Sequence, residues 1–351
     1  MKKSIILLIL IIPFIVACSY NSDRNISSKF EDYLRVPSHF PKPEFPADNP
    51  YSKEKAELGR YLFYESLLVK DTGFPSCSHC MYQEAAFSNN VAFARGSNNM
   101  SQMRNNMSLA NVVYRPLIFW DGHANKIERP SYGSLYMTDI FDSDTNEIVK
   151  RLEDSPLYPA LFKAAFPDGK ISAYNISLAI ATFVRTMISG NSRYDQYLNG
   201  NKSALDAAEL RGMDLFFSER CRCSVCHSGI MFTDMKAHNT GVTSHYFDRG
   251  RFWVTHNYKD RNAFLTPSLR NVEKTAPYMS DGWLVSLEEV IDHYNIGGLE
   301  FALKDTLMRP LNLNPQEKSD LIAFLKSLTD EEFLTDPRFS NPHRKLSHLK
   351  K

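Results

Sequence analysis

Apolar residues recur at helical spacing in several parts of the chain. After Ser172, five of them fall at positions i, i+4, i+7, i+8 and i+11, which lie on one face of a helix. They are Ile176, Ile180, Phe183, Val184 and Met187. Gly190 then supplies a stop signal. The pattern predicts a core helix that begins after Ser172 and ends before Gly190.

Capping signals mark two further helices. Asn314 is a typical helix-capping residue. It is followed by Pro315 at the first helical position and by the acidic residue Glu317 at the third. Ser286 and Glu289 have the spacing of a capping box. Weaker patterns predict helices over 52–64, 146–165 and 206–217.

Long polar stretches separate these helices. Residues 88–112 and 228–285 are rich in Asn, Ser, Gly and Asp. Loops of that length in a compact chain usually enclose something. The pattern therefore predicts a mainly α fold with long loops that wrap a bound group.

Length and composition narrow the class of protein. A chain of 351 residues suggests two domains, and the polar segment from Asn191 to Ser203 is a candidate boundary. Its 43% apolar and 23% charged residues are typical of a globular protein. The net charge of +1 provides no general attraction for polyanions, so nucleic-acid binding is not expected.

The amino terminus has the form of an export signal. Lys2 and Lys3 precede an apolar run from Ile5 to Val16, which is short for a membrane-spanning helix. The run ends in a sequence that resembles a bacterial lipobox, so Cys18 is predicted to carry acyl chains. The alternative is an ordinary signal peptide with an incidental Cys18. Either reading places the mature chain outside the cytoplasm.

The segments flanking the folded body are expected to be extended. We assign 1–17 to a lipoprotein signal peptide and the proline-spaced residues 18–50 to a semi-rigid linker. The folded part is expected to start near Tyr51, and residues 336–351 are expected to form a basic, frayed tail.

The clearest chemical motif is Cys-x-x-Cys-His at Cys223, Cys226 and His227. Two thiols at this spacing can bond covalently to the two vinyl groups of one haem, and the adjacent imidazole then binds the iron. A zinc half-site and a redox disulfide are the competing interpretations. Cys221 is left over.

A second thiol pair lies in the first half. Cys77 and Cys80 have the same spacing, but Met81 stands where the histidine would be. The spacing alone is compatible with a disulfide or a metal site as well as with haem.

Several segments, in order, resemble the bacterial di-haem cytochrome c peroxidases and the related MauG-type enzymes. The first half contains SCSHCMYQEAAFSN and RNNMSLANVVYRPLIFWDG. The second half contains ELRGMDLFF, CSVCHSGIMFTD, FLTPSLRN, TAPYMSDG and SLEEVIDHYN. The resemblance implies two cytochrome c-like helical domains, over 51–195 and 196–335, each with a covalently bound haem c. It also implies calcium between the domains.

The resemblance assigns roles to particular residues. His227 matches the proximal ligand of the second haem, and Tyr294 matches the distal ligand, which is Met in conventional peroxidases and Tyr in MauG-like members. A phenolate favours ferric iron, whereas a thioether favours ferrous iron. Trp120 matches the aromatic residue between the haems. Without the resemblance, Tyr294 and Trp120 would be interpreted as ordinary packed residues.

The resemblance also supplies the calcium ligands. Asn105, together with the backbone carbonyls of Thr275 and Pro277, matches these positions. Oxygen donors of this kind are what calcium requires.

Four positions depart from the family pattern around the first haem. Met81 replaces the proximal histidine, Pro130 and Ile140 replace a glutamine and a glutamate, and Ser280 replaces a histidine. An isoleucine cannot transfer a proton. Three acids nearby in the sequence, Glu128, Asp139 and Asp142, are candidates to substitute, although a charged residue near a loop is more often simply solvated.

Two functions follow from the resemblance. The first is an exported di-haem redox enzyme that reduces hydrogen peroxide, or oxidises a protein partner through high-valent haem, with a cytochrome or another redox protein as electron donor. The second is a non-catalytic electron-transfer or assembly partner with a degenerate first site and Met81 as a possible iron ligand. In both, a lipid anchor holds the chain to a bacterial membrane, facing the periplasm or the exterior.

Overall fold

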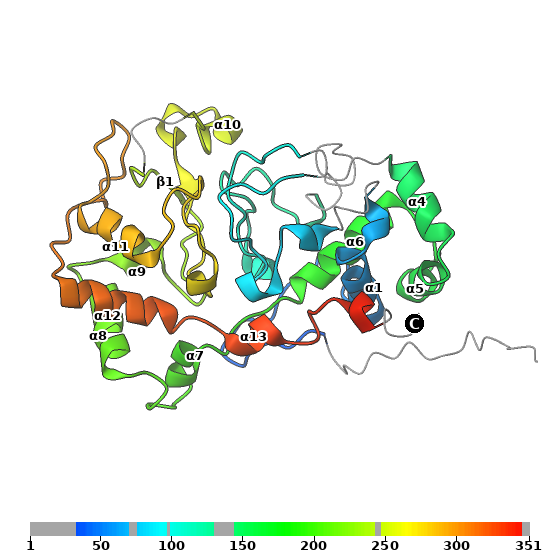
Figure 1. The fold of residues 1–351 in the computed structure, drawn as a ribbon, viewed down its shortest axis with the longest axis horizontal. Coiled ribbons are helices and arrows are strands. Elements are labelled where there is room, and N and C mark those ends of the chain that lie inside the picture. The colour runs from blue at the N-terminus through cyan, green and yellow to red at the C-terminus, as the bar shows by residue number, and fades with distance from the viewer. Residues whose placement is uncertain (1–32, 70–75, 97–98, 130–143, 243–246, 346–351) are drawn as a thin grey trace, which may run out of the picture. The chain divides into compact units, whose positions relative to one another are not determined.

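The computed structural model describes residues 33–69, 76–96, 99–129, 144–242 and 247–345 (Figure 1). These residues all belong to one compact unit. Cys18, Pro130, Asp139, Ile140 and Asp142 lie outside the described residues. No helix within the described ranges has the length and apolarity needed to cross a bilayer.

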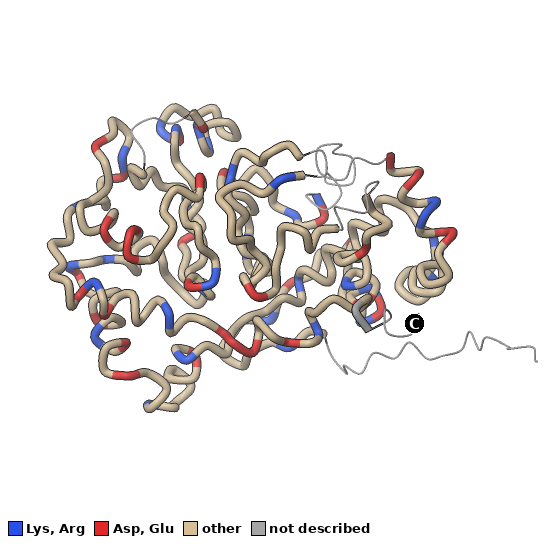
Figure 2. Tube along the Cα trace, in the orientation of Figure 1, with Lys and Arg blue, Asp and Glu red and all other residues tan. Residues whose placement is uncertain are grey.

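The fold is mainly helical, as the sequence predicts. Its α-helices are α1 Lys53–Phe63, α4 Thr145–Glu153, α5 Tyr158–Ala165, α6 Ala173–Arg185, α7 Arg193–Leu198, α8 Ala207–Phe217, α9 Cys223–Cys226, α10 Phe252–Thr255, α11 Leu287–Asn295, α12 Pro315–Lys326 and α13 Glu331–Thr335. In the described ranges the only sheet is the antiparallel pair of β1 Ala237–His238 and β2 Phe264–Leu265. Acidic and basic residues are interspersed along the trace (Figure 2).

The first hydrophobic core is built on α1 and α6, with α4 and α5 beside them. The hydroxyl of Ser172 accepts a hydrogen bond from the backbone N–H of Asn175 and so caps α6, as predicted. The helix expected over 146–165 is instead two helices, α4 and α5. Pro156 interrupts the pattern because its nitrogen carries no hydrogen to donate.

The second core is built on α8, α11 and α12. Asn314 and Glu317 form a reciprocal capping box at the start of α12. Ser286 caps α11 by accepting from the N–H of Glu289. The expected capping box is incomplete there, because the Glu289 carboxylate accepts from the N–H of Val285 instead.

The same helix contact occurs in both cores. A Cβ atom added to Gly59 of α1 would lie 1.9 Å from the carbonyl oxygen of Ala179 in α6. One added to Gly212 of α8 would lie 1.9 Å from the carbonyl oxygen of Asp320 in α12. In each half a glycine therefore allows two helix backbones to touch.

Gly59→Ala tests this contact. Helix propensity alone would make alanine more stable than glycine by about 1 kcal/mol. Because the obstructing atom belongs to a helix backbone and cannot rotate away, we expect the free energy of unfolding to fall by about 3 kcal/mol. Denaturant unfolding monitored by circular dichroism measures the change. Unchanged or increased stability would show that the two helices separate easily.

A second pair of matching segments runs over 109–124 and 269–284. Asn111 and Asn271 both have a φ of 60°, and Phe119 and Met279 have φ values of 68° and 70°. Each segment also forms one antiparallel bridge, Ile118 with Ala124 and Tyr278 with Leu284. The two halves are therefore internal repeats, and Trp120 and Ser280 occupy equivalent positions.

The segments expected to be extended pack onto the body. Tyr33 is fully buried, and the Asn49 side chain donates to Glu128 (2.8 Å) and to the carbonyl oxygen of Leu178 (3.0 Å). In the expected tail, Phe339 joins the first core. The linker prediction is therefore wrong for 33–50, and the frayed-tail prediction is wrong for 336–345. Single anchoring residues between prolines leave no periodic pattern to detect.

The expected boundary at 191–203 contains α7, which holds a buried ion pair. Both carboxylate oxygens of Asp195 accept from Arg270, at 2.8 and 2.9 Å. Burial by itself would raise the pKa of Asp195, but the hydrogen bonds from Arg270 outweigh it and the pKa is lowered. The ion pair therefore fixes α7 to the loop that carries Arg270.

Candidate functional site

A single helical turn presents the Cys-x-x-Cys-His motif. Cys223 and Cys226 are the first and last residues of α9, and the backbone N–H of His227 donates to the carbonyl oxygen of Cys223 (2.9 Å). Nδ1 of His227 lies 3.0 Å from the carbonyl oxygen of Phe232, so Nδ1 carries the proton and Nε2 keeps its lone pair. Burial lowers the pKa of His227, which favours the neutral imidazole that an iron ligand requires.

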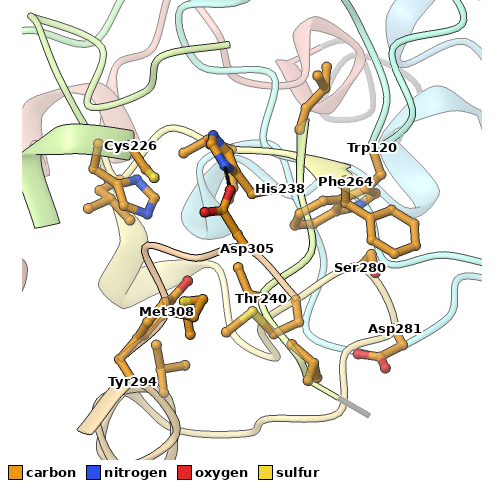
Figure 3. A pocket seen from close by; sticks show the side chains of 18 of the residues that line it. Trp120, Cys226, His238, Thr240, Phe264, Ser280, Asp281, Tyr294, Asp305 and Met308 are labelled. Carbon is orange, nitrogen blue, oxygen red and sulfur yellow. Dashed lines mark hydrogen bonds and ion pairs between the residues drawn. The ribbon is translucent and has the colours of Figure 1, made fainter. Parts of the chain in front are cut away.

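These residues face a cavity of about 580 Å³, within the range of cofactor sites of roughly 300–1,000 Å³. Tyr294 of α11 contributes a phenol to the same cavity (Figure 3). Its apolar walls include Phe216, Leu269, Val290, Ile291, Leu321 and Leu325. Paired thiols, a neutral imidazole, a phenol and apolar walls together fit a covalently bound haem c.

The cavity strongly desolvates Tyr294. Burial raises the pKa of its phenol well above the ordinary value, and the nearby thiols of Cys226 and Cys223 raise it further. The phenol is therefore protonated unless a positive charge, such as that of ferric iron, stabilises the phenolate.

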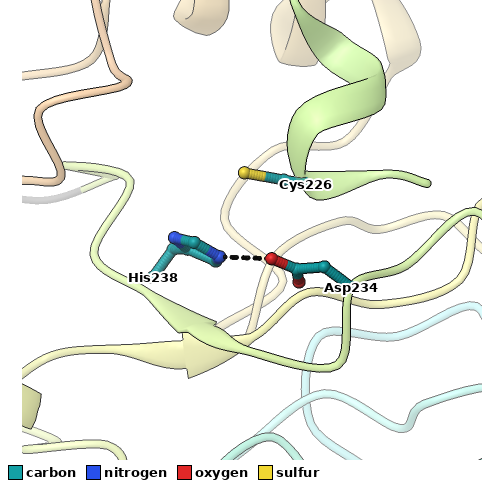
Figure 4. A group of neighbouring side chains, drawn as sticks. All are labelled: Cys226, Asp234 and His238. Carbon is teal, nitrogen blue, oxygen red and sulfur yellow. Dashed lines mark hydrogen bonds and ion pairs between the residues drawn. The ribbon is translucent and has the colours of Figure 1, made fainter.

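Sequence reasoning missed an ionic cluster beside Cys226 (Figure 4). Nε2 of His238 lies 2.9 Å from Asp234 Oδ2, and Nδ1 lies 2.6 Å from Asp305 Oδ2. Hydrogen bonding with Cys226 and with these two carboxylates raises the pKa of His238 to about 10 despite its burial. No sequence signal links Asp305 to His238, because a loop contact joins them.

The cluster also bears on the zinc alternative. Ligand atoms of Cys226, Asp234 and His238 lie within 4.8 Å of one another, which would suit a metal ion if the thiol were free. A thioether bond to haem would remove the sulfur as an anionic ligand. Neither thiol pair of the described structure forms a disulfide.

The first thiol pair also lies on one turn. Cys77 begins the short 3-10 helix Cys77–His79, and Cys80 follows directly. Cys77 and Met81 both pack against the first core. Burial, with a smaller effect of Cys80, raises the pKa of Cys77 to about 12. A second pair of closely spaced thiols is therefore present here, with Met81 in the place that His227 has in the second half.

Trp120 joins the first half to the second. It is 8% exposed and lines the large cavity. Its indole nitrogen donates to the carbonyl oxygen of Asn105 (2.9 Å), and its own carbonyl accepts from the N–H of Leu265 (2.7 Å). Ser280, at the equivalent position of the other repeat, lines the same cavity, and its backbone carbonyl oxygen accepts from the N–H of Asn105 (2.8 Å).

The candidate calcium ligands lie on segments that meet. The Asn105 side chain donates to the carbonyl oxygens of Val91 (3.1 Å) and Ala92 (3.3 Å). A Cβ at Gly282 would lie 2.6 Å from Cα of Ala92 and 3.3 Å from Cγ of Pro277. The structure thus brings Asn105 and Pro277 to one junction. Calcium binding there, with Thr275 as a third ligand, stays a prediction.

Glu128, one of the acids considered for the first site, is already engaged. Its two carboxylate oxygens accept from Arg185, at 2.5 and 2.8 Å. Burial tends to raise the pKa of Glu128, but the bonds from Arg185 and Asn49 lower it overall. A carboxylate held in this way is a poor proton donor.

Comparison with known proteins gives consistent matches. Residues 53–203 match the family model described as di-haem cytochrome c peroxidase. The chain is 33% identical to the cytochrome-c peroxidase IdrP1 of Pseudomonas sp. (strain SCT), over 86% of this chain and 88% of that protein. It is 32% identical to the methylamine utilization protein MauG of Methylorubrum extorquens, over 90% of this chain and 91% of that protein.

A solved structure agrees with these matches. A MauG-like protein associated with microbial copper homeostasis superposes with a TM-score of 0.82 at 38% identity, covering 88% of this chain and 98% of that one. The paired cysteines, the neutral imidazole and the cavity are in keeping with this likeness. The chain belongs to the di-haem cytochrome c peroxidase and MauG family.

Proposed function

We propose that this chain is an exported di-haem c-type redox protein that reduces hydrogen peroxide or oxidises a protein partner. The observation that carries the proposal is the cavity in which Cys223, Cys226, His227 and Tyr294 converge. A haem bound there would supply redox chemistry at its iron. A cytochrome or another redox protein would supply the electrons.

Each residue of this cavity has a distinct role in the proposal. The thiols of Cys223 and Cys226 would tether the haem, and Nε2 of His227, which keeps its lone pair, would be one iron ligand. The phenol of Tyr294 would be a second iron ligand in its deprotonated form. Trp120 forms part of the cavity wall with its indole hydrogen-bonded, so its ring is held in a fixed position for electron transfer between the halves.

Three features of the proposal rest on sequence and resemblance. Cys18 anchors the exported chain to a membrane by lipid. Cys77 and Cys80 hold a first haem, with Met81 as a possible iron ligand. Asn105, Thr275 and Pro277 bind calcium at the junction between the halves.

A second candidate function is electron transfer without peroxide turnover. Met81 in place of histidine, Glu128 held by Arg185 and Ser280 in place of histidine all weaken the first site for peroxide chemistry. In that case the second haem would exchange electrons with a partner while the first site stayed inert.

Adding hydrogen peroxide to the matured, fully loaded protein distinguishes these functions. For a peroxidase we expect two haems per chain by the pyridine haemochrome assay, and oxidation of an added reduced cytochrome that depends on peroxide. Trp120→Phe should slow the oxidation while leaving the haem content unchanged. Reversible reduction with no peroxide-dependent oxidation would favour the second function. Protein without a Soret band would contradict both.

A further inference from the structure

The wall of the large cavity carries a thioether close to Tyr294. Met308 lines the cavity together with Tyr294, and its side chain is half-buried. In Figure 3, Met308 lies at the tyrosine end of the cavity, on a loop distinct from helix α11. Neither the motif around His227 nor the one around Tyr294 includes this methionine.

The turn after α11 brings Met308 against the segment that carries Tyr294. Gly297 and Gly298 have φ values of 80° and 70°, which allow the chain to reverse directly after the helix. A Cβ at Gly298 would lie 3.3 Å from Cε of Met308 and 3.4 Å from Cε1 of His293. The Met308 methyl group is therefore next to the turn that immediately follows Tyr294.

Backbone hydrogen bonds hold the Met308 loop on both sides. The N–H of Leu311 donates to the carbonyl oxygen of Asn295 (3.0 Å), and the N–H of Asp305 donates to that of Asn239 (2.8 Å). The N–H of Met308 itself donates to the carbonyl oxygen of Asp305 (3.0 Å). These bonds keep the thioether near the cavity while leaving its unbranched side chain free to change rotamer.

The two side chains suit different oxidation states of iron. A phenolate is anionic and stabilises ferric iron, whereas a thioether is neutral and soft and stabilises ferrous iron. Reduction removes one positive charge from the iron, and the buried phenolate then loses much of its electrostatic stabilisation. A thioether in the same wall carries no such desolvation cost.

We propose that Met308 is an alternative axial ligand of the second haem. When the electron donor reduces the iron, the bond from the Tyr294 oxygen to the iron breaks, the released phenolate takes up a proton from solvent, and the Met308 sulfur binds in its place. The proposal rests on the proposed haem at Cys223, Cys226 and His227. It makes the ligand of this haem dependent on its oxidation state, with tyrosine for the oxidised protein and methionine for the reduced protein.

Removing the phenol should reveal the thioether. In ferric Tyr294→Phe protein we expect six-coordinate, low-spin haem with the near-infrared charge-transfer band of iron bound by methionine sulfur. The band should be lost in Tyr294→Phe/Met308→Leu. It should persist in the matched control Tyr294→Phe/Met279→Leu, because Met279 lines the same cavity on another loop. A high-spin spectrum in ferrous Tyr294→Phe that Met308→Leu leaves unchanged would overturn the proposal.

Carbon monoxide binding gives a second measurement that keeps Tyr294 in place. If Met308 occupies roughly nine-tenths of the ferrous sites, Met308→Leu should bind carbon monoxide about tenfold more tightly than wild type. Equal affinities would count against ligation by Met308. Haem content distinguishes failure of the ligand exchange from failure of the proposed function. Wild-type protein without a second haem would contradict the proposed function. Protein that contains both haems but shows none of these effects would contradict only the ligand exchange.

Discussion

Cys223→Ala/Cys226→Ala protein is expected to contain one haem per chain in place of two. The substitution removes both sulfurs proposed to tether the second haem, while Cys77 and Cys80 remain on their own turn in the other half. The low-spin signal proposed for iron bound by His227 and Tyr294 should disappear with it. Pyridine haemochrome content and electron paramagnetic resonance measure the two effects.

Cys221 provides the matched control for this experiment. It is a buried cysteine two residues before Cys223, and it lines the same cavity. Cys221→Ala should keep both haems, because the spacing from Cys221 to Cys226 does not match the attachment motif. Loss of haem from Cys221→Ala together with retention in the double variant would reverse the assignment of the attachment thiols.

Restoring the family residues at the first site is expected to raise peroxide turnover by about 100-fold, a typical contribution of one positioned proton-transfer group. The variant is Met81→His/Ile140→Glu, which supplies an imidazole for the iron and a carboxylate for proton transfer. Ile140 lies outside the described residues, so this part of the expectation rests on the resemblance. The measurement is peroxide-dependent oxidation of a reduced cytochrome by protein with equal haem content.

Met100→His is the control for the histidine itself. Met100 is 57% exposed and is not among the residues that line the cavity, so a histidine there should leave turnover unchanged. If Met81→His/Ile140→Glu is no faster than wild type, then residues other than these two limit the first site.

Local patterns in the sequence predicted the helices well. The apolar stripe and Ser172 predicted α6, and the caps at Asn314 and Ser286 predicted α12 and α11. Each of these signals depends on residues within a few positions of one another. The same is true of the thiol pair on α9, which the structure places in one cavity with Tyr294.

Contacts between distant segments left no such signal. The pairing of Asp195 with Arg270 and of His238 with Asp305 depends on loops that meet only in the folded chain. The packing of 33–50 and 336–345 was missed for the same physical reason. The repeat over 109–124 and 269–284 was detectable, because the two segments share an L-x-N-V start and a D-G turn, and a comparison of the chain with itself would have found it.

The helix contacts at Gly59 and Gly212, which stabilise the two halves, involve different residues from those proposed to bind haem. Each half is held together by a backbone-to-backbone helix crossing that involves none of the attachment thiols. One repeat can therefore accumulate changes such as Met81 while its scaffold still folds. In this way one half of a repeated fold can lose its own redox chemistry and still support the structure of the other half.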